Sequence, residues 1–347
     1  MIKVLDSDIR FFYLTRALVF VFLVLLATLI SSSFSLDSLA YQDIFSTYSK
    51  TGWSEIFSEI KQYELFFLFS AKVFNGLPSV FWFGFIAFLS ILLKLTLVQK
   101  GSRNFYLSLF FYVAYFFVLQ DGTGIRVSLA IALAFWGAFC LSKDRFFWAF
   151  FLFSIAALFF HYSLFLFFIV FFFRDRRVSY FFVFLWPFLI ILWWFGFDLI
   201  SVIRSVVIDL DLNVIGLNKF RYYALNVSAS SAPYSLQFLI LYIASVLVFL
   251  RFKDELKSFE LICFNCVFVS MVFLGVFVGA EGLQNRVSEI FRFGLVFIFP
   301  FYYQFCLEAT RNRMLTNVLV FGGLIGYFYY YVLRAGLIVW PENGSLY

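Results

Sequence analysis

Arg126 and His161 are the residues whose chemistry stands out in this sequence. Arg126 lies at the start of an otherwise apolar segment, 125–141, and His161 is the only histidine in the chain. A charged side chain at membrane depth costs roughly 2.5 to 3.5 kcal/mol on insertion scales, so something must compensate for it. A guanidinium matches phosphate oxygens, and a helix N-terminus adds backbone donors. The sequence therefore predicts an anion site at Arg126; the alternative is an arginine that snorkels to the membrane interface.

A second cationic cluster is formed by Arg286, Glu289 and Arg292, which are spaced three residues apart. Residues at this spacing share roughly one face of a helix. A single carboxylate cannot neutralise two guanidiniums, so we expect the surplus cation to bind an external anion. For Glu289, an internal salt bridge that orients the helices is the alternative.

His161 is a candidate general base. A neutral imidazole near pH 7 can accept a proton from a hydroxyl within hydrogen-bond reach. The apolar Phe159 and Phe160 and a nearby arginine are expected to keep the ring neutral. The alternative is a histidine that caps a buried turn, and Asp37 or Glu281 would then be the base.

The composition defines the class of protein. Hydrophobic residues make up 64% of the 347 residues and charged residues only 13%, whereas roughly half of a soluble protein is apolar. The chain is therefore predicted to be an all-α polytopic membrane protein. Its net charge of +6 fits cytoplasmic loops, so nucleic-acid binding is set aside.

Apolar segments predict about eleven transmembrane helices. The segment 105–120 is near the lower length limit of about 17 residues, and 164–173 is too short to cross alone unless its turn is buried in the protein. We treat residues 1–347 as a single transmembrane domain. The predicted spans are 17–30, 80–98, 105–120, 125–141, 146–160, 164–173, 179–197, 234–250, 259–279, 287–307 and 315–333.

The distribution of lysine and arginine predicts a cytoplasmic N-terminus, because short cytoplasmic loops are enriched in these residues. On the cytoplasmic side we place Lys94, Lys100, Arg103, Lys143 and Lys257, among others. The loops 36–61 and 198–233 then face outward. We expect them to shape a substrate cleft, with candidate binding residues Asp37, Tyr41, Arg221 and Tyr222.

The sequence contains no pattern that indicates a metal or a cofactor. Nucleotide-binding loops and HExxH are absent. Cys263 and Cys266 form an isolated CxxC, which is more typical of helix packing than of zinc binding.

Four short motifs carry a family resemblance: IRVSLA around Arg126, FHYS around His161, Arg286 at the start of a late span, and DSLAY from Asp37 to Tyr41. In order and spacing they resemble the EpsG-like branch of the bacterial Wzy polysaccharide polymerases. The chain departs from that pattern after Arg286, since isoleucine and phenylalanine stand where the family has a tyrosine.

The resemblance implies an inner-membrane glycosyltransferase of GT-C type that acts at the periplasmic face. Its donor and acceptor would be glycans linked to undecaprenyl diphosphate, which it would join into O-antigen, capsule or exopolysaccharide. Membrane lipid and a chain-length regulator are the other expected partners. Fixed arginines would replace a metal in stabilising the departing diphosphate. An O-antigen ligase and a lipid-linked oligosaccharide flippase are the alternatives.

Overall fold

The computed structural model describes residues 2–35, 37–53, 64–197, 202, 236–278 and 281–334. Within these ranges the regular elements are helices, as the sequence predicts. Their bounds are α1 (Ile2–Leu29), η1 (Ile30–Phe34), α2 (Ser38–Lys50), α4 (Leu65–Val73), α5 (Ser79–Gly101), α6 (Phe105–Phe111), η2 (Tyr112–Thr123), α7 (Ile125–Leu141), α8 (Phe146–Ile155), η3 (Ala156–Phe160), η4 (Tyr162–Phe172), α9 (Arg176–Trp194), α12 (Leu236–Phe252), α13 (Ser258–Val276), α14 (Glu281–Arg292), α15 (Leu295–Thr310), α16 (Arg313–Phe328) and η5 (Tyr329–Arg334).

Several of these helices are long and apolar enough to cross a membrane. Five qualify by length and hydropathy in the described part of the chain, and a sixth qualifies if a bent helix pair counts as one span. The five are Leu14–Phe34, Ser79–Gly101, Phe105–Thr123, Arg176–Trp194 and Ser258–Val276. The other predicted spans are apolar helices of 10–17 residues. The protein is thus a multi-pass helical membrane protein, and the count of eleven crossings stays a prediction.

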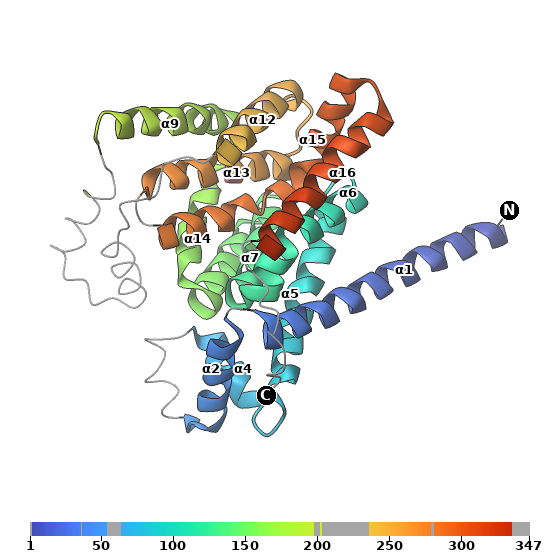
Figure 1. Cartoon of the computed structure of the whole chain (residues 1–347), viewed down its shortest axis with the longest axis vertical. Coiled ribbons are helices and arrows are strands. Elements are labelled where there is room, and N and C mark those ends of the chain that lie inside the picture. Colours follow the sequence, from blue (N-terminus) through green and yellow to red (C-terminus); the bar gives the residue numbers. More distant parts are fainter. Residues whose placement is uncertain are drawn as a thin grey trace.

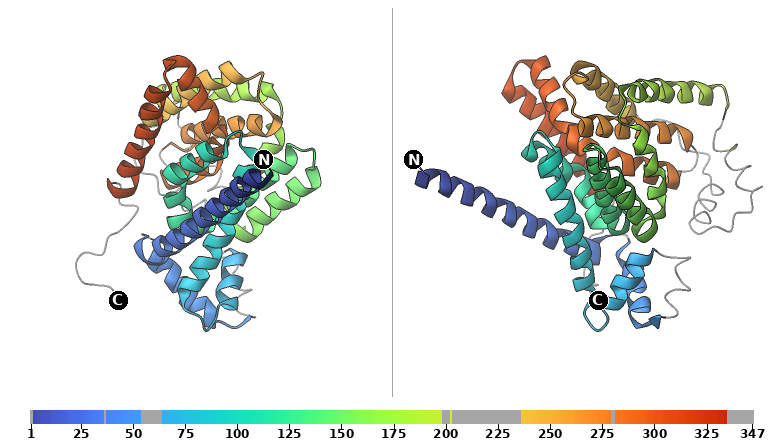
Figure 2. Two further views of the ribbon diagram at one scale, coloured as in Figure 1. Left: turned by 90° about the vertical axis from the view of Figure 1, so that its right-hand side faces the viewer. Right: turned by 180° about the vertical axis from the view of Figure 1, so that it is seen from behind.

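Helix α13 forms the centre of the larger core. It packs against α9, α12, α14 and α15, and most of its side chains are buried. Figures 1 and 2 show the helices gathered into one bundle, from which the N-terminal part of α1 projects. The core contains many phenylalanines, with edge-to-face pairs such as Phe135 with Phe293, whose ring centroids are 5.2 Å apart. Such pairs pack large apolar rings without polar groups that would need partners.

A smaller core is formed by side chains of α2, α4 and the first turns of α5. Helices α2 and α4 lie side by side at the lower end of the molecule in Figure 1. Trp82 is fully buried there, and its indole N–H donates to Ser70 Oγ at 2.8 Å. Ile125, the residue before Arg126, belongs to the same cluster. Ser38–Lys50 of the predicted outer loop 36–61 therefore forms a helix that packs beside the start of α7. The other predicted loop, 198–233, lies outside the described residues except for Val202.

The predicted span 287–307 is a broken helix. The segments Gln284–Arg292 and Leu295–Thr310 meet at 68°, with Gly294 at the joint. A Cβ atom at Gly294 would lie 2.7 Å from the backbone oxygen of Cys263. The bend therefore requires glycine, because α13 approaches the chain too closely for any side chain.

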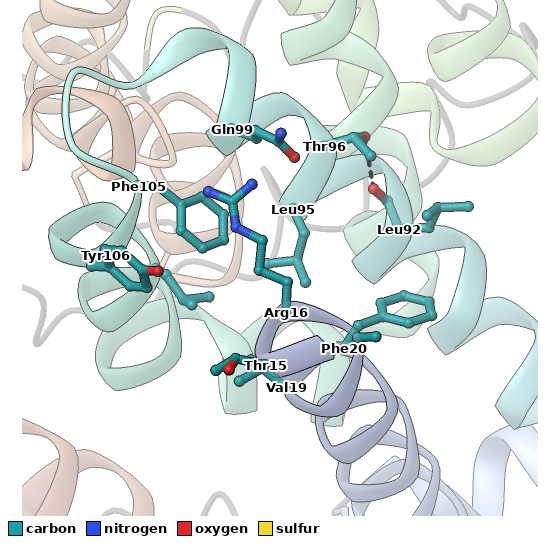
Figure 3. A pocket seen from close by; sticks show the side chains of 12 residues that line it. Thr15, Arg16, Val19, Phe20, Leu92, Leu95, Thr96, Gln99, Phe105 and Tyr106 are labelled. Atoms are coloured by element: carbon teal, nitrogen blue, oxygen red, sulfur yellow. Dashed lines mark hydrogen bonds between the residues drawn. The ribbon is translucent and has the colours of Figure 1, made fainter. Parts of the chain in front are cut away.

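A groove of about 220 Å³ is lined by residues of α1, α5 and α6. Figure 3 shows Arg16 and Gln99 at one end of it, among apolar side chains such as Phe20 and Leu95. The Arg16 guanidinium lies 4.3 Å from the centre of the Phe105 ring. The groove contains none of the predicted site residues.

Candidate active site

A buried carboxylate, Glu64, joins the two residues that the sequence singled out. Arg126 Nη1 donates to Glu64 Oε2 at 3.1 Å, and His161 Nδ1 lies 3.0 Å from Glu64 Oε1. The Glu64 side chain is 1% exposed, whereas those of Arg126 and His161 are 23% and 20% exposed. The Glu64 carboxylate is therefore buried beneath the Arg126 and His161 side chains, which are partly exposed.

Local backbone structure explains how these residues meet. Glu64 has extended geometry at the N-cap of α4, and Arg126 is the second residue of α7. His161 is extended, with φ of −164°, at the break between η3 and η4. A residue at such a break does not follow a helical face, so its side chain can point toward a neighbouring element. Each of the three side chains comes from a helix end, where the chain changes direction.

Tyr41 completes the cluster. Arg126 Cζ lies 5.6 Å from the centre of the Tyr41 ring, and Tyr41 is buried. Burial raises the pKa of Tyr41 and Asp37 adds to the rise, while Arg126 opposes it. The phenol is therefore neutral at physiological pH. Asp37 itself is exposed at the N-cap of α2, and its side chain makes no capping hydrogen bond.

The electrostatics differ from the sequence expectation for His161. The charged group in contact with its ring is the carboxylate of Glu64 and not an arginine. A carboxylate that accepts the Nδ1–H of an imidazole fixes the orientation of the ring. Arg126 is paired inside the protein with Glu64 and also interacts with Tyr41. Its guanidinium carries five N–H donors, so donors remain for a further acceptor.

Sequence reasoning missed Glu64. The residue directly precedes the apolar run of α4, and an acid before such a run is a signal for a helix N-terminus. Nothing in the sequence connects it with Arg126, which is 62 positions away. Only the tertiary structure brings the two together.

The second predicted cluster is less open than expected. Arg292 is 6% exposed and donates from Nη2 to Ser288 Oγ at 3.0 Å. Its guanidinium also lies 4.6 Å from the centre of the Phe238 ring. Glu289 Oε1 and Arg292 Nε are buried without a hydrogen-bond partner among the described residues. Arg286, six residues before Arg292, is exposed.

Three further predicted residues are not tested by the geometry. Glu281 is the first residue of α14, and its side chain is not described. Arg221 and Tyr222 lie outside the described residues. Their part in substrate binding stays a prediction.

A buried ion pair lies behind the Arg126 turn. Lys94 Nζ is 2.8 Å from Asp121 Oδ2, and both side chains are 0% exposed. Lys94 also donates to Ser128 Oγ at 2.7 Å, and Ser90 Oγ donates to Asp121 Oδ1 at 2.6 Å. The prediction that Lys94 marks the cytoplasmic surface is wrong, because a carboxylate on η2 compensates its charge within the bundle.

The network holds both sides of the turn that carries Arg126. Asp121 precedes Arg126 by five positions and Ser128 follows it by two, and Lys94 of α5 binds both of them. Tyr112 adds a hydrogen bond from its hydroxyl to Asp121 Oδ2 at 2.5 Å. Satisfied polar networks of this kind make a buried arrangement rigid.

The described residues include no group of three or more His, Cys, Asp or Glu placed to hold a metal ion. Cys263 and Cys266 are fully buried side chains of α13.

The fold and this cluster define a multi-pass helical membrane protein with a partly buried Arg–Glu–His constellation at its helix ends. The model of the EpsG family matches residues 13–341, so the chain belongs to the EpsG family. This is a Wzy-like family of polysaccharide polymerases, and membership implies a polymerase of the glycosyltransferase type. No curated protein and no solved structure matches the chain.

Proposed function

We propose that this protein joins oligosaccharide repeat units carried on undecaprenyl diphosphate, at the periplasmic face of the bacterial inner membrane. The product would be O-antigen, capsule or exopolysaccharide. The proposal includes a GT-C-like architecture in which the shorter apolar helices complete about eleven crossings. The bridging of Arg126 and His161 by Glu64 is the observation that carries it.

The reaction transfers a glycan from its lipid diphosphate to an acceptor hydroxyl. The hydroxyl oxygen attacks the anomeric carbon while the bond from that carbon to the diphosphate oxygen breaks. The diphosphate departs with the bonding electrons, and the hydroxyl proton goes to a base. A base and a fixed cation near the departing charge therefore satisfy the two chemical demands of this step.

His161 is assigned as the base. Donation of Nδ1–H to Glu64 leaves Nε2 as the acceptor for the hydroxyl proton. Glu64 then acts as a positioning residue that stabilises the imidazolium, the role that a carboxylate has behind histidine in hydrolase triads.

Arg126 is assigned to the diphosphate. Its remaining donors and the N-terminus of α7 favour an anion at this point. Arg286 is proposed as a second cation from α14, with Arg292, Glu289, Glu281, Asp37, Arg221 and Tyr222 as further candidates for the substrate cleft. No metal or cofactor is required for this scheme, because fixed guanidiniums can stabilise the leaving group.

The surface polysaccharide of a deletion strain tests the proposal. Loss of a polymerase leaves single repeat units on the acceptor, whereas loss of a ligase leaves a bare acceptor. Loss of a flippase instead accumulates lipid-linked units in the cytoplasm. Either of the last two results would replace the polymerase assignment by the corresponding alternative.

A further inference from the structure

A second cavity, of about 140 Å³, lies at the end of the bundle away from Arg126. It forms between the C-terminus of α5, the turn after α7 and the start of α13. Helix α7 has 17 residues, so its length separates this cavity from Arg126 by about 25 Å at 1.5 Å per residue. The cavity is therefore distinct from the candidate active site.

Four cations from separate segments line this cavity: Lys100, Arg103, Lys143 and Lys257. We call it the basic pocket. Its one acidic lining residue is Glu260, which Arg103 already neutralises through Nε at 2.8 Å and Nη2 at 3.1 Å. In the described part of the chain, no carboxylate lies within ion-pair distance of the three lysines. The basic pocket thus keeps a surplus of positive charge.

Aromatic packing fixes the floor of the basic pocket. Phe139 and Phe259 meet edge to face with centroids 5.3 Å apart. A Cβ atom at Gly101 would lie 2.5 Å from the Phe259 ring, so glycine allows α5 to end directly against α13. Lys143 Nζ lies 5.7 Å from the centre of the Phe139 ring. The cations therefore surround a built depression, not a flat surface.

We propose that the basic pocket binds the phosphate group of an anionic phospholipid. Basic pockets between transmembrane helices select anionic lipid headgroups, and several ammonium donors can share the oxygens of one phosphate. The next turn supplies a surface for acyl chains, since Phe146 and Phe147 are 50% and 73% exposed directly after the Lys143 turn. The enrichment of lysine and arginine in short cytoplasmic loops explains why many cations lie at this end of the bundle. That enrichment does not require four of them to line one cavity.

Binding of defined lipids to the purified full-length protein tests this proposal by native mass spectrometry. The probes are phosphatidylglycerol, zwitterionic phosphatidylcholine with the same acyl chains, and inorganic phosphate as a competitor. Wild-type protein is expected to retain phosphatidylglycerol in preference to phosphatidylcholine. The triple variant Lys100→Gln, Lys143→Gln, Lys257→Gln should weaken this binding about a hundredfold, because each basic side chain near an anionic surface contributes roughly a fivefold factor.

The matched control is Arg145→Gln, Arg177→Gln, Arg313→Gln, which removes the same charge from exposed residues outside the basic pocket. It should keep the preference for phosphatidylglycerol. Equal losses in the two triple variants, or no loss in the first, would overturn the proposal. Displacement of the lipid by millimolar phosphate would identify free phosphate as the ligand of the same site, and retention would identify the lipid. Because the readout is lipid binding, the result does not depend on the proposed glycosyl transfer.

Discussion

Glu64 and His161 are bound to each other through Oε1 and Nδ1, at 3.0 Å, although 97 positions separate them in the chain. The other carboxylate oxygen of Glu64 binds Arg126. A single buried carboxylate thus sets the positions of a candidate base and of a candidate phosphate ligand. Substitution of Glu64 should therefore disturb the placement of both His161 and Arg126 while both side chains remain present.

Glu64→Gln is expected to lower the rate of polymerisation by at least about a hundredfold, which is the lower bound for general-base catalysis. Glutamine keeps the size of the side chain, but it lacks the charge that stabilises imidazolium. Chain length in a polymerisation assay with purified protein measures the effect. Asp43→Asn, which removes an exposed carboxylate of α2, is the control and should leave the rate unchanged. Full activity of Glu64→Gln would refute the positioning role.

His161→Gln is expected to lose about 10² to 10⁴ in rate, because glutamine can hydrogen-bond but cannot take up a proton at neutral pH. Expression and thermal stability should stay near those of the wild type, since a hydrogen bond to Glu64 can be retained. Near-normal polymer from a well-expressed variant would make His161 a structural residue.

Arg126→Lys is expected to lose most of the activity while the protein still inserts into the membrane. Lysine keeps the charge opposite Glu64 but offers a point charge in place of a planar fork. Polymer length in a complemented deletion strain measures the effect, and immunoblotting of membranes confirms insertion. Long polymer at wild-type levels from Arg126→Ala would end the assignment to the diphosphate.

Tyr41→Phe is expected to keep most of the activity, because the ring remains against Arg126, whereas Tyr41→Ala should lose substantially more. The raised pKa of Tyr41 also predicts a pH effect on stability. The folded protein retains the phenolic proton more tightly than the unfolded chain, so this contribution is complete below pH of about 10 and is lost as the pH rises further. Raising the pH above about 10 should therefore lower the unfolding temperature of the wild type more than that of Tyr41→Phe. Parallel pH profiles of the two proteins would contradict this.

Lys94→Met is expected to destabilise the protein by about 3 to 5 kcal/mol, because it leaves Asp121 buried without its cation. The double variant Lys94→Met, Asp121→Asn should recover much of that loss, since no unpaired charge remains. Thermal unfolding of purified proteins measures both, with Lys50→Met on the exposed face of α2 as the control. A double variant less stable than Lys94→Met would mean that the charges themselves are needed.

Much of the fold followed from local sequence. Apolar runs predicted the helices 125–141 and 146–160 with the bounds that the structure shows, because helix formation in lipid depends on the composition of each segment. The family followed from short motifs around Arg126 and His161, and the match over residues 13–341 confirms it. The break at Gly294 was not predicted, because it depends on the distance to α13 and not on a helix-breaking pattern in 287–307.

The composition of the site was decided by tertiary structure. The types of Arg126 and His161 marked them as functional candidates, since a cation and a lone imidazole are unusual in so apolar a chain. The sequence could not reveal that both bind Glu64, or that Lys94 is paired with Asp121 inside the bundle. A charged residue in an apolar sequence indicates only that it needs a compensating partner in a low-dielectric environment. Which residue is that partner depends on how helices that are distant along the chain pack together.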